Sequence, residues 1–235
     1  MNITQAIEKG RLCLSESDSS GADSHYILCH VLACTITYLH TWPDKNLSTQ
    51  QNIDYETLLL KRKTGMPVAY LIGQQSFWSL ELDVNAETLI PRPDTEILVA
   101  MALEKIQLGM VVADLGTGSG AIALALASEK KGVHFMAMDR SLGALKVAQA
   151  NAKKCKIMNI TFWQGDWLSS IAKNTLDMIV TNPPYIASND PHLKRGDLRF
   201  EPSSALVSGQ DGLEDTRLIV KQARLALKSK SWLLI

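Results

Sequence analysis

The feature that most restricts the fold is the alternation of strand and helix patterns from residue 110 onward. Short apolar runs predict strands at 110–115, 133–138, 160–164, 176–181 and 232–235. Segments with helical periodicity separate most of them, at 121–128, 141–154 and 213–227. Strands that alternate with helices form a mainly parallel sheet with helices on both faces. We therefore predict an α/β fold with a doubly wound, mainly parallel sheet.

The first 75 residues have a different pattern, which predicts helices alone. Apolar spacing indicates helices over 3–14 and 22–39, and a third that Ser48 caps and that runs to Lys63. The region carries six Lys and Arg residues against seven Asp and Glu residues. A helical domain with this charge is better suited to docking a protein partner than to binding nucleic acid.

The segments between and beyond these regions complete the expected organisation. Residues 76–93 predict a β-hairpin linker, with a strand at 76–84, a turn at 85–87 and a return strand at 88–90. Residues 94–235 then form the α/β domain. Within it, residues 186–211 are too long for a plain connector, so we expect a lid or a substrate-facing loop there.

Charge and hydropathy narrow the possible functions. Lys and Arg number 24 and Asp and Glu also number 24, so the chain lacks the basic excess that sequence-independent nucleic-acid binding needs. No apolar run approaches the roughly 20 residues of a membrane span, and the N-terminus lacks the pattern of a signal peptide. We therefore expect a cytoplasmic protein without a membrane partner.

Two of the four cysteines, Cys29 and Cys34, lie near His25 and His30, which raises the possibility of a metal site. Apolar residues at helical spacing surround them, however, and this pattern favours reduced thiols packed on a buried helix. No other grouping resembles a ligand set, so we predict no metal.

The tetrapeptide Asn182-Pro183-Pro184-Tyr185 directly follows the apolar run 178–180. Its two prolines stop the strand and leave a stiff loop that presents an amide, free carbonyls and an aromatic ring. Such a set suits a planar NH2 group, with acceptors for both hydrogens and a ring against its face. An ordinary turn is the alternative, because Asn-Pro is a common turn dipeptide.

A glycine-rich loop, Asp114-Leu115-Gly116-Thr117-Gly118-Ser119-Gly120, joins the first strand of the sheet to its helix. Its spacing is G-x-G-x-G and not the G-x-G-x-x-G of dinucleotide enzymes, which argues against a dehydrogenase. The acidic residue before it and the absence of a lysine favour a cationic ligand that carries an amino acid over a pyrophosphate.

Acidic residues end the next two strands. Asp139 lies 23 positions after Gly116, close to where a carboxylate accepts the hydroxyls of a ribose, although it could instead cap the following helix. Asp166 could meet the exocyclic amine of adenine, and Trp167 could stack on the base or simply fill the core. Four strand ends are thus predicted to converge on a methionine-linked adenosine cofactor and on a nitrogen to be methylated.

In this order, the glycine loop, Asp139, Gly-Asp-Trp and Asn-Pro-Pro-Tyr resemble the pattern of class I S-adenosylmethionine-dependent methyltransferases. Three further stretches, at 77–80, 89–96 and 190–202, resemble the protein-glutamine methyltransferases of peptide release factors (the HemK/PrmC family). The resemblance covers essentially the whole chain. It implies the class I methyltransferase fold, an N-terminal substrate-recognition domain, and a monomer that methylates the glutamine of the Gly-Gly-Gln motif in class I release factors. In the family the chain continues past the last strand, so we expect C-terminal strands to be missing here.

The resemblance also implies roles for the site residues. The cofactor would contact Gly116, Thr117, Gly118, Ser119, Gly120, Asp139, Asp166, Trp167 and Asn182. The substrate amide would bind to Asn182, Pro183, Pro184 and Tyr185, of which Asn182, Pro183 and Tyr185 would act in catalysis. Arg92 lies between two prolines and could face a ligand or solvent.

Three alternatives stay open. An adenine-amino methyltransferase of DNA or RNA shares the tetrapeptide, but should carry a basic target-recognition segment. A glutamine methyltransferase of a ribosomal protein would use the same chemistry. A binding protein on a methyltransferase scaffold would need no catalytic tetrapeptide.

Overall fold

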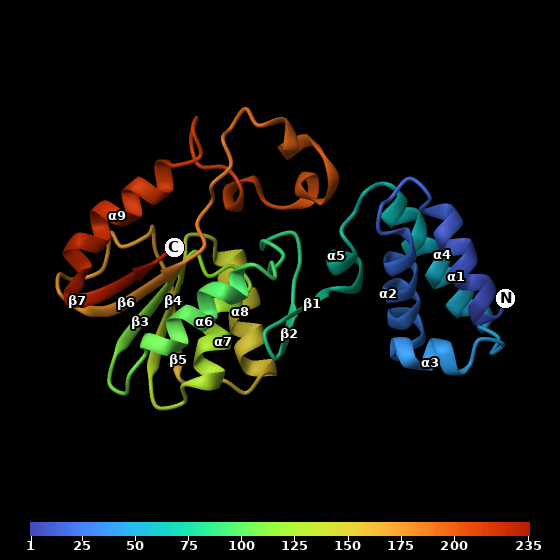
Figure 1. Cartoon of the computed structure of the whole chain (residues 1–235), viewed down its shortest axis with the longest axis horizontal. Helices are drawn as coiled ribbons and strands as arrows, with labels where there is room; N and C mark the ends of the chain where they lie inside the picture. Colours follow the sequence, from blue (N-terminus) through green and yellow to red (C-terminus); the bar gives the residue numbers. More distant parts are fainter. The chain divides into compact units, whose positions relative to one another are not determined.

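The computed structural model describes residues 1–235, which form two compact units, Met1–Gly73 and Gln74–Ile235 (Figure 1). Each unit has a hydrophobic core of its own. The hairpin that we predicted as a separate linker falls within the second unit. No helix in either unit combines the length and the apolar character that crossing a membrane requires.

The first unit is entirely helical. Its helices are α1 (Ile3–Cys13), α2 (Ser20–Leu32), α3 (Ile36–Thr41), α4 (Thr49–Lys63) and α5 (Val68–Ile72). Ser48 caps α4 as predicted: its hydroxyl accepts the Gln51 N–H, and the Gln51 side chain accepts the Ser48 N–H. Ile27, Leu28 and Tyr55 are fully buried between these helices and form the centre of the core.

The single helix predicted over 22–39 is wrong. Ala33 adopts a left-handed conformation with φ of 49° and ends α2, and Thr35 then caps the separate helix α3. The predicted helices also omitted α5. Cys29 and Cys34 pack against the core of this unit, and burial raises the pKa of Cys29 to about 11. The structure contains no group of three or more His, Cys, Asp or Glu side chains placed to hold a metal ion.

The hairpin uses different strands from those predicted. β1 (Gln74–Phe77) pairs antiparallel with β2 (Leu80–Asp83), and the chain turns at Trp78, whose φ is 56°. The predicted return strand at 88–90 is wrong, because the Ile90 N–H donates to the Glu201 carboxylate at 3.0 Å instead of to a strand. Residues 88–90 are therefore loop, and Thr88 and Leu89 line the site described below.

The sheet of the second unit confirms the predicted doubly wound architecture. Its strands are β3 (Val111–Leu115), β4 (His134–Asp139), β5 (Ile160–Gln164), β6 (Leu176–Thr181) and β7 (Leu227–Leu234). They lie in the order β5-β4-β3-β6-β7, and every neighbouring pair is parallel. The last strand begins at Leu227, five residues before the predicted start at Trp232.

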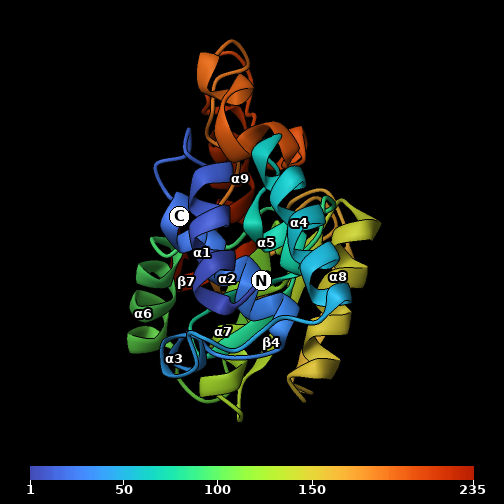
Figure 2. The same ribbon diagram turned by 90° about the vertical axis from the view of Figure 1, so that its right-hand side faces the viewer.

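Helices cover both faces of this sheet. Helices α6 (Thr95–Lys105), α7 (Ala121–Glu129) and α8 (Leu142–Lys154) pack with the hairpin on one face. Helix α9 (Glu214–Ala226) packs on the other face. Figure 1 shows α9 on the far side of the strands from these helices, and Figure 2 shows α7 between α6 and α8. The central strands β3 and β6 are buried because they lie between these two layers.

The strand order reverses between β3 and β6, and this reversal positions the site. From β3 the chain crosses to β4 and β5 on one side, whereas β6 and β7 lie on the other. Ligands of open α/β sheets bind at such a switch point, outside the carboxyl ends of the strands. The segment after β6 contains three short 3-10 helices, at Pro191–Lys194, Gly196–Phe200 and Ser203–Ala205. A parallel bridge between Ile186 and Val207 closes its base.

Candidate active site

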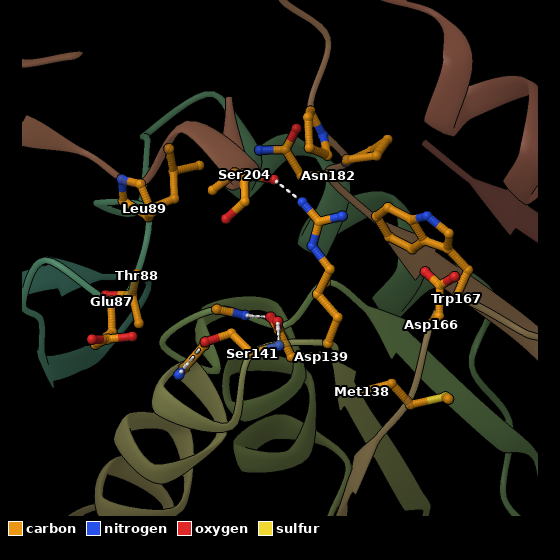
Figure 3. Close-up of a pocket in the computed structure, with 18 of the residues that line it drawn as sticks. Glu87, Thr88, Leu89, Met138, Asp139, Ser141, Asp166, Trp167, Asn182 and Ser204 are labelled. Carbon is orange, nitrogen blue, oxygen red and sulfur yellow. Dashed lines mark hydrogen bonds between the residues drawn. The ribbon is translucent and has the colours of Figure 1, made fainter. Parts of the chain in front are cut away.

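A cleft opens at the carboxyl ends of β3, β4, β5 and β6, where the four predicted strand ends meet (Figure 3). Eight of the predicted site residues line it: Gly116, Gly118, Asp139, Asp166, Trp167, Asn182, Pro183 and Pro184. Thr117, Ser119, Gly120 and Tyr185 are not part of its lining. The structure thus brings together residues from all four strand ends, and their roles stay predictions.

The glycine loop presents backbone to the cleft and hides its side chains. Gly116 and Gly118 have φ of 68° and 56°, a region that glycine adopts without the cost borne by other residues. Thr117 and Ser119 are buried beneath the loop: the Thr117 hydroxyl donates to Asp114, and the Ser119 carbonyl accepts from the side chain of Asn151. Two of the nine residues predicted to contact a cofactor, Thr117 and Ser119, therefore shape the loop from below.

Asp114 is one of these supporting residues. Its Oδ2 accepts the Thr117 hydroxyl at 2.6 Å and the Ala123 N–H at 3.2 Å, and its buried Oδ1 has no partner. Burial is the largest influence and raises the pKa of Asp114 from 3.8 to about 7. The acidic residue that we associated with a cationic ligand thus lies below the loop and not in the cleft.

Asp139 ends β4 and links two backbone segments. Its Oδ2 accepts the Gly118 N–H at 2.9 Å, and its Oδ1 accepts the Ser141 N–H at 2.8 Å. Ser141 is itself the N-cap of α8 and accepts the Ala144 N–H. A carboxylate offers about four lone-pair sites, so two of those of Asp139 remain for donors in the cleft. The carboxylate can therefore shape the loop and bind hydroxyl groups at once.

Asp166 and Trp167 follow β5 at the opposite wall. Trp167 has φ of 47°, and its indole N–H donates to Asp215 at 3.0 Å. Its ring lies against Gly116, where a Cβ atom would come within 3.3 Å of it. The indole packs against the core and also lines the cleft, so its role as a core residue is confirmed and its stacking on a base stays a prediction.

Asn182 and Pro183 form a wall between this cleft and a second, smaller pocket. The second pocket is also lined by Arg92, Tyr185 and residues of the segment 186–206. The Tyr185 side chain is 66% exposed and faces this second space. The tetrapeptide is therefore divided between two pockets, with its first two residues common to both.

The Asn182 amide is oriented by a neighbour that the sequence did not indicate. Its Nδ2 donates to the hydroxyl of Thr95 at 3.2 Å. Thr95 is the first residue of α6, so this contact joins two segments that lie 87 residues apart.

Two further walls of the cleft were not assigned from the sequence. One comes from Glu87, Thr88 and Leu89 and the other from Pro202, Ser204 and Ala205. Arg140 also lines the cleft, and its guanidinium donates to the Ser204 carbonyl at 3.0 Å. Only Leu89 and Pro202 fall in stretches that supported the family resemblance, and none of these residues has a chemical pattern that marks a site.

Arg92, for which we left two interpretations open, pairs with Glu201. The Glu201 side chain is completely buried, and that of Arg92 is 34% exposed. The same carboxylate accepts the Ile90 N–H. Glu201 thus fixes the segment 186–211 to residues 90–92, behind the walls of both pockets.

The comparisons with known proteins agree with this architecture. The family described as "Methyltransferase small domain" matches residues 93–198, and the "PrmC N-terminal domain" matches residues 5–73. A release factor glutamine methyltransferase of Vibrio cholerae is 50% identical over 223 residues, which cover 94% of this chain and 78% of the relative. Those of Escherichia coli K12 and Shewanella oneidensis are 44% and 43% identical, covering 94% and 99% of this chain and 80% and 82% of the relatives. With identity of this level over nearly its whole length, the chain belongs to the family of release factor glutamine methyltransferases.

Proposed function

We propose that the protein transfers a methyl group from S-adenosylmethionine to the side-chain amide nitrogen of the glutamine in the Gly-Gly-Gln motif of class I release factors. The observation that carries the proposal is the wall that two pockets share. Asn182 and Pro183 face the large cleft on one side and the smaller pocket on the other. A cofactor in the first and a glutamine side chain in the second would meet at these two residues.

The residues of the cleft fit this cofactor. Its lining includes three carboxylates, Glu87, Asp139 and Asp166, against one basic side chain, which favours a cationic ligand. Asp139 keeps acceptor capacity for ribose hydroxyls, and the backbone at Gly116 and Gly118 allows a close approach. Leu89, Met138 and Pro202 supply apolar surface for a base. When bound, S-adenosylmethionine supplies an electrophilic methyl group on its sulfonium.

The chain's own residues prepare the glutamine nitrogen. An amide nitrogen is a weak nucleophile, because its lone pair is delocalised into the carbonyl. Asn182 Oδ1 and the Pro183 carbonyl accept the two amide hydrogens, which places electron density on the nitrogen and fixes the amide plane. Tyr185 orients the amide from the second pocket. Positioning at near-attack distance then supplies much of the rate acceleration.

The remaining parts of the proposal concern the partner. The helical unit Met1–Gly73 would recognise the release factor, since its acidic-leaning charge suits a protein better than a nucleic acid. We expect the enzyme to act as a monomer in the cytoplasm, where release factors function. DNA, RNA and ribosomal proteins are the competing substrates.

A transfer assay with the methyl group of S-adenosylmethionine labelled distinguishes these substrates. A class I release factor, the same factor with the motif glutamine replaced by alanine, ribosomal proteins and duplex DNA are offered separately. We expect label on the intact release factor alone. Label on the DNA alone, or equal label on both release factors, would overturn the proposal.

The role of the tetrapeptide is tested with Asn182→Ala. Because an acceptor that acts at the reacting nitrogen is lost, we expect kcat to fall by about 100-fold or more. Cofactor affinity, measured by calorimetry, should change by no more than a few-fold. Asn189→Ala is the matched control, since Asn189 is exposed and lies outside both pockets. Wild-type turnover in Asn182→Ala with normal cofactor binding would refute the mechanism.

A further inference from the structure

The contact between Asn182 and Thr95 has a consequence for the reaction. Asn182 Nδ2 donates to Thr95 Oγ1 at 3.2 Å, and both residues are partly buried. Thr95 lines neither pocket, so it does not touch a ligand in either one. It can act on the chemistry only through Asn182.

An asparagine side chain has two ends of nearly equal shape and opposite function. The oxygen accepts hydrogen bonds, and the NH2 group donates them. Rotation about the last side-chain bond exchanges the two ends, because the preference of this torsion is broad and roughly two-fold. The substrate amide nitrogen is itself a donor, so it pairs with Oδ1 and is repelled by Nδ2. The useful orientation of Asn182 is therefore only one of two.

The hydrogen bond to Thr95 engages the NH2 end of Asn182 and so favours the orientation in which Oδ1 is free to accept. With Nδ2 directed to Thr95, Oδ1 is left for the wall that faces the two pockets. Without the hydroxyl, nothing at position 95 would hold the NH2 group, and the amide could turn its donor end toward the substrate.

Thr95 is itself held in place from both sides. The next residue, Glu96, accepts the Trp78 N–H at 2.7 Å, which ties the start of α6 to the hairpin. The preceding loop is fixed because Glu201 binds the Ile90 N–H and the Arg92 guanidinium. Because Thr95 is held in place by these contacts, its hydroxyl has little freedom to move and can fix the orientation of the Asn182 amide.

We propose that Thr95 is a positioning residue for methyl transfer, whose hydroxyl holds Nδ2 of Asn182 so that Oδ1 faces the glutamine amide. This inference rests on the function proposed above. It assigns to the first residue of α6 a role in turnover and none in the binding of cofactor or release factor.

The test compares Thr95→Val, which keeps the shape and removes the hydroxyl, with Thr95→Ser, which keeps the hydroxyl. Thr216→Val is the matched control, because Thr216 also lies in the first turn of a helix, is partly buried like Thr95 and lines neither pocket. For each full-length variant, kcat and KM are measured with a class I release factor, the cofactor Kd by calorimetry and the Tm by thermal unfolding.

We expect kcat of Thr95→Val to fall roughly 3- to 10-fold, the effect of one net hydrogen bond. KM, Kd and Tm should stay close to wild type, Thr95→Ser should recover at least half of the wild-type kcat, and Thr216→Val should match wild type. Full kcat in Thr95→Val would overturn the inference. So would an equal loss in Thr95→Ser, or a loss that appears in Kd or Tm instead of kcat. Failure of the wild-type enzyme to label any release factor would instead refute the proposed function, so the two failures are distinct.

Discussion

Removing Arg92 should destabilise the protein more than neutralising its partner Glu201, although the two changes break the same ion pair. The Glu201 side chain is completely buried, whereas one third of the Arg92 side chain reaches solvent. Arg92→Met therefore leaves a buried carboxylate with only the Ile90 N–H as partner. Glu201→Gln leaves an arginine that can turn toward water and keeps an oxygen to accept the Ile90 N–H.

The expected magnitudes follow from this asymmetry. Leaving a buried charge unpaired costs about 3–5 kcal/mol. We expect Arg92→Met to lose about 3 kcal/mol at pH 7, and Glu201→Gln to lose about 1 kcal/mol, the value of a typical net hydrogen bond.

Hydrogen exchange of the Ile90 amide measures the effect at the site itself, and urea unfolding at pH 7 measures it globally. A loss of about 3 kcal/mol corresponds to roughly 100-fold faster exchange when opening is at equilibrium. Arg217→Met is the matched control, because Arg217 forms an exposed ion pair with Asp211 in the same unit, and it should leave exchange at Ile90 unchanged. If Glu201→Gln cost as much as Arg92→Met, the reasoning from burial would be refuted.

Two further predictions concern the glycine loop and the residue beneath it. Because burial raises the pKa of Asp114 to about 7, the folded protein keeps a proton that the unfolded chain releases from about pH 4 upward. The unfolding free energy of wild type relative to Asp114→Asn should therefore fall as pH rises from about 4 to 7, by at most about 1.4 kcal/mol per pH unit, and urea titrations that give a flat difference would contradict this. Gly116→Ala should cost about 1–2 kcal/mol, because φ is 68° there, and weaken cofactor binding at least about 10-fold, because the new methyl group presses on Trp167. Gly21→Ala, a helical position with open space around it, is the control for calorimetry and urea unfolding, and an equal effect there would refute the prediction.

The sheet could be predicted from the sequence because each strand is marked by a pattern within its own few residues. The apolar runs at β3 and β6 are buried on both faces, so they read as strands without knowledge of their neighbours. The acidic residues and prolines that follow the strands mark the strand ends, and parallel strands place those ends at one edge. The convergence of Gly116, Asp139, Trp167 and Asn182 on one cleft follows from these two facts.

The parts that could not be predicted depend on contacts between distant residues or on single backbone torsions. Nothing in the residue type of Ala33 indicates a left-handed conformation, so the break between α2 and α3 leaves little trace in the sequence. Thr88 and Ile90 are β-branched, as is typical of strands, but the position of this segment is set by Glu201, more than 100 residues away. The link from Thr95 to Asn182 has the same character, since each residue by itself resembles an ordinary helix start or turn.

These long separations also determine when the site can form during synthesis. The contacts that shape its walls join Thr95 to Asn182, Arg92 to Glu201 and Ile90 to Glu201, over 87, 109 and 111 residues. The helical unit Met1–Gly73 closes its own core from residues that leave the ribosome first. The walls of the site can close only after residue 201 has been added, since loop closure must precede the contacts that stabilise it. A nascent chain thus carries a folded N-terminal unit well before it carries a cleft.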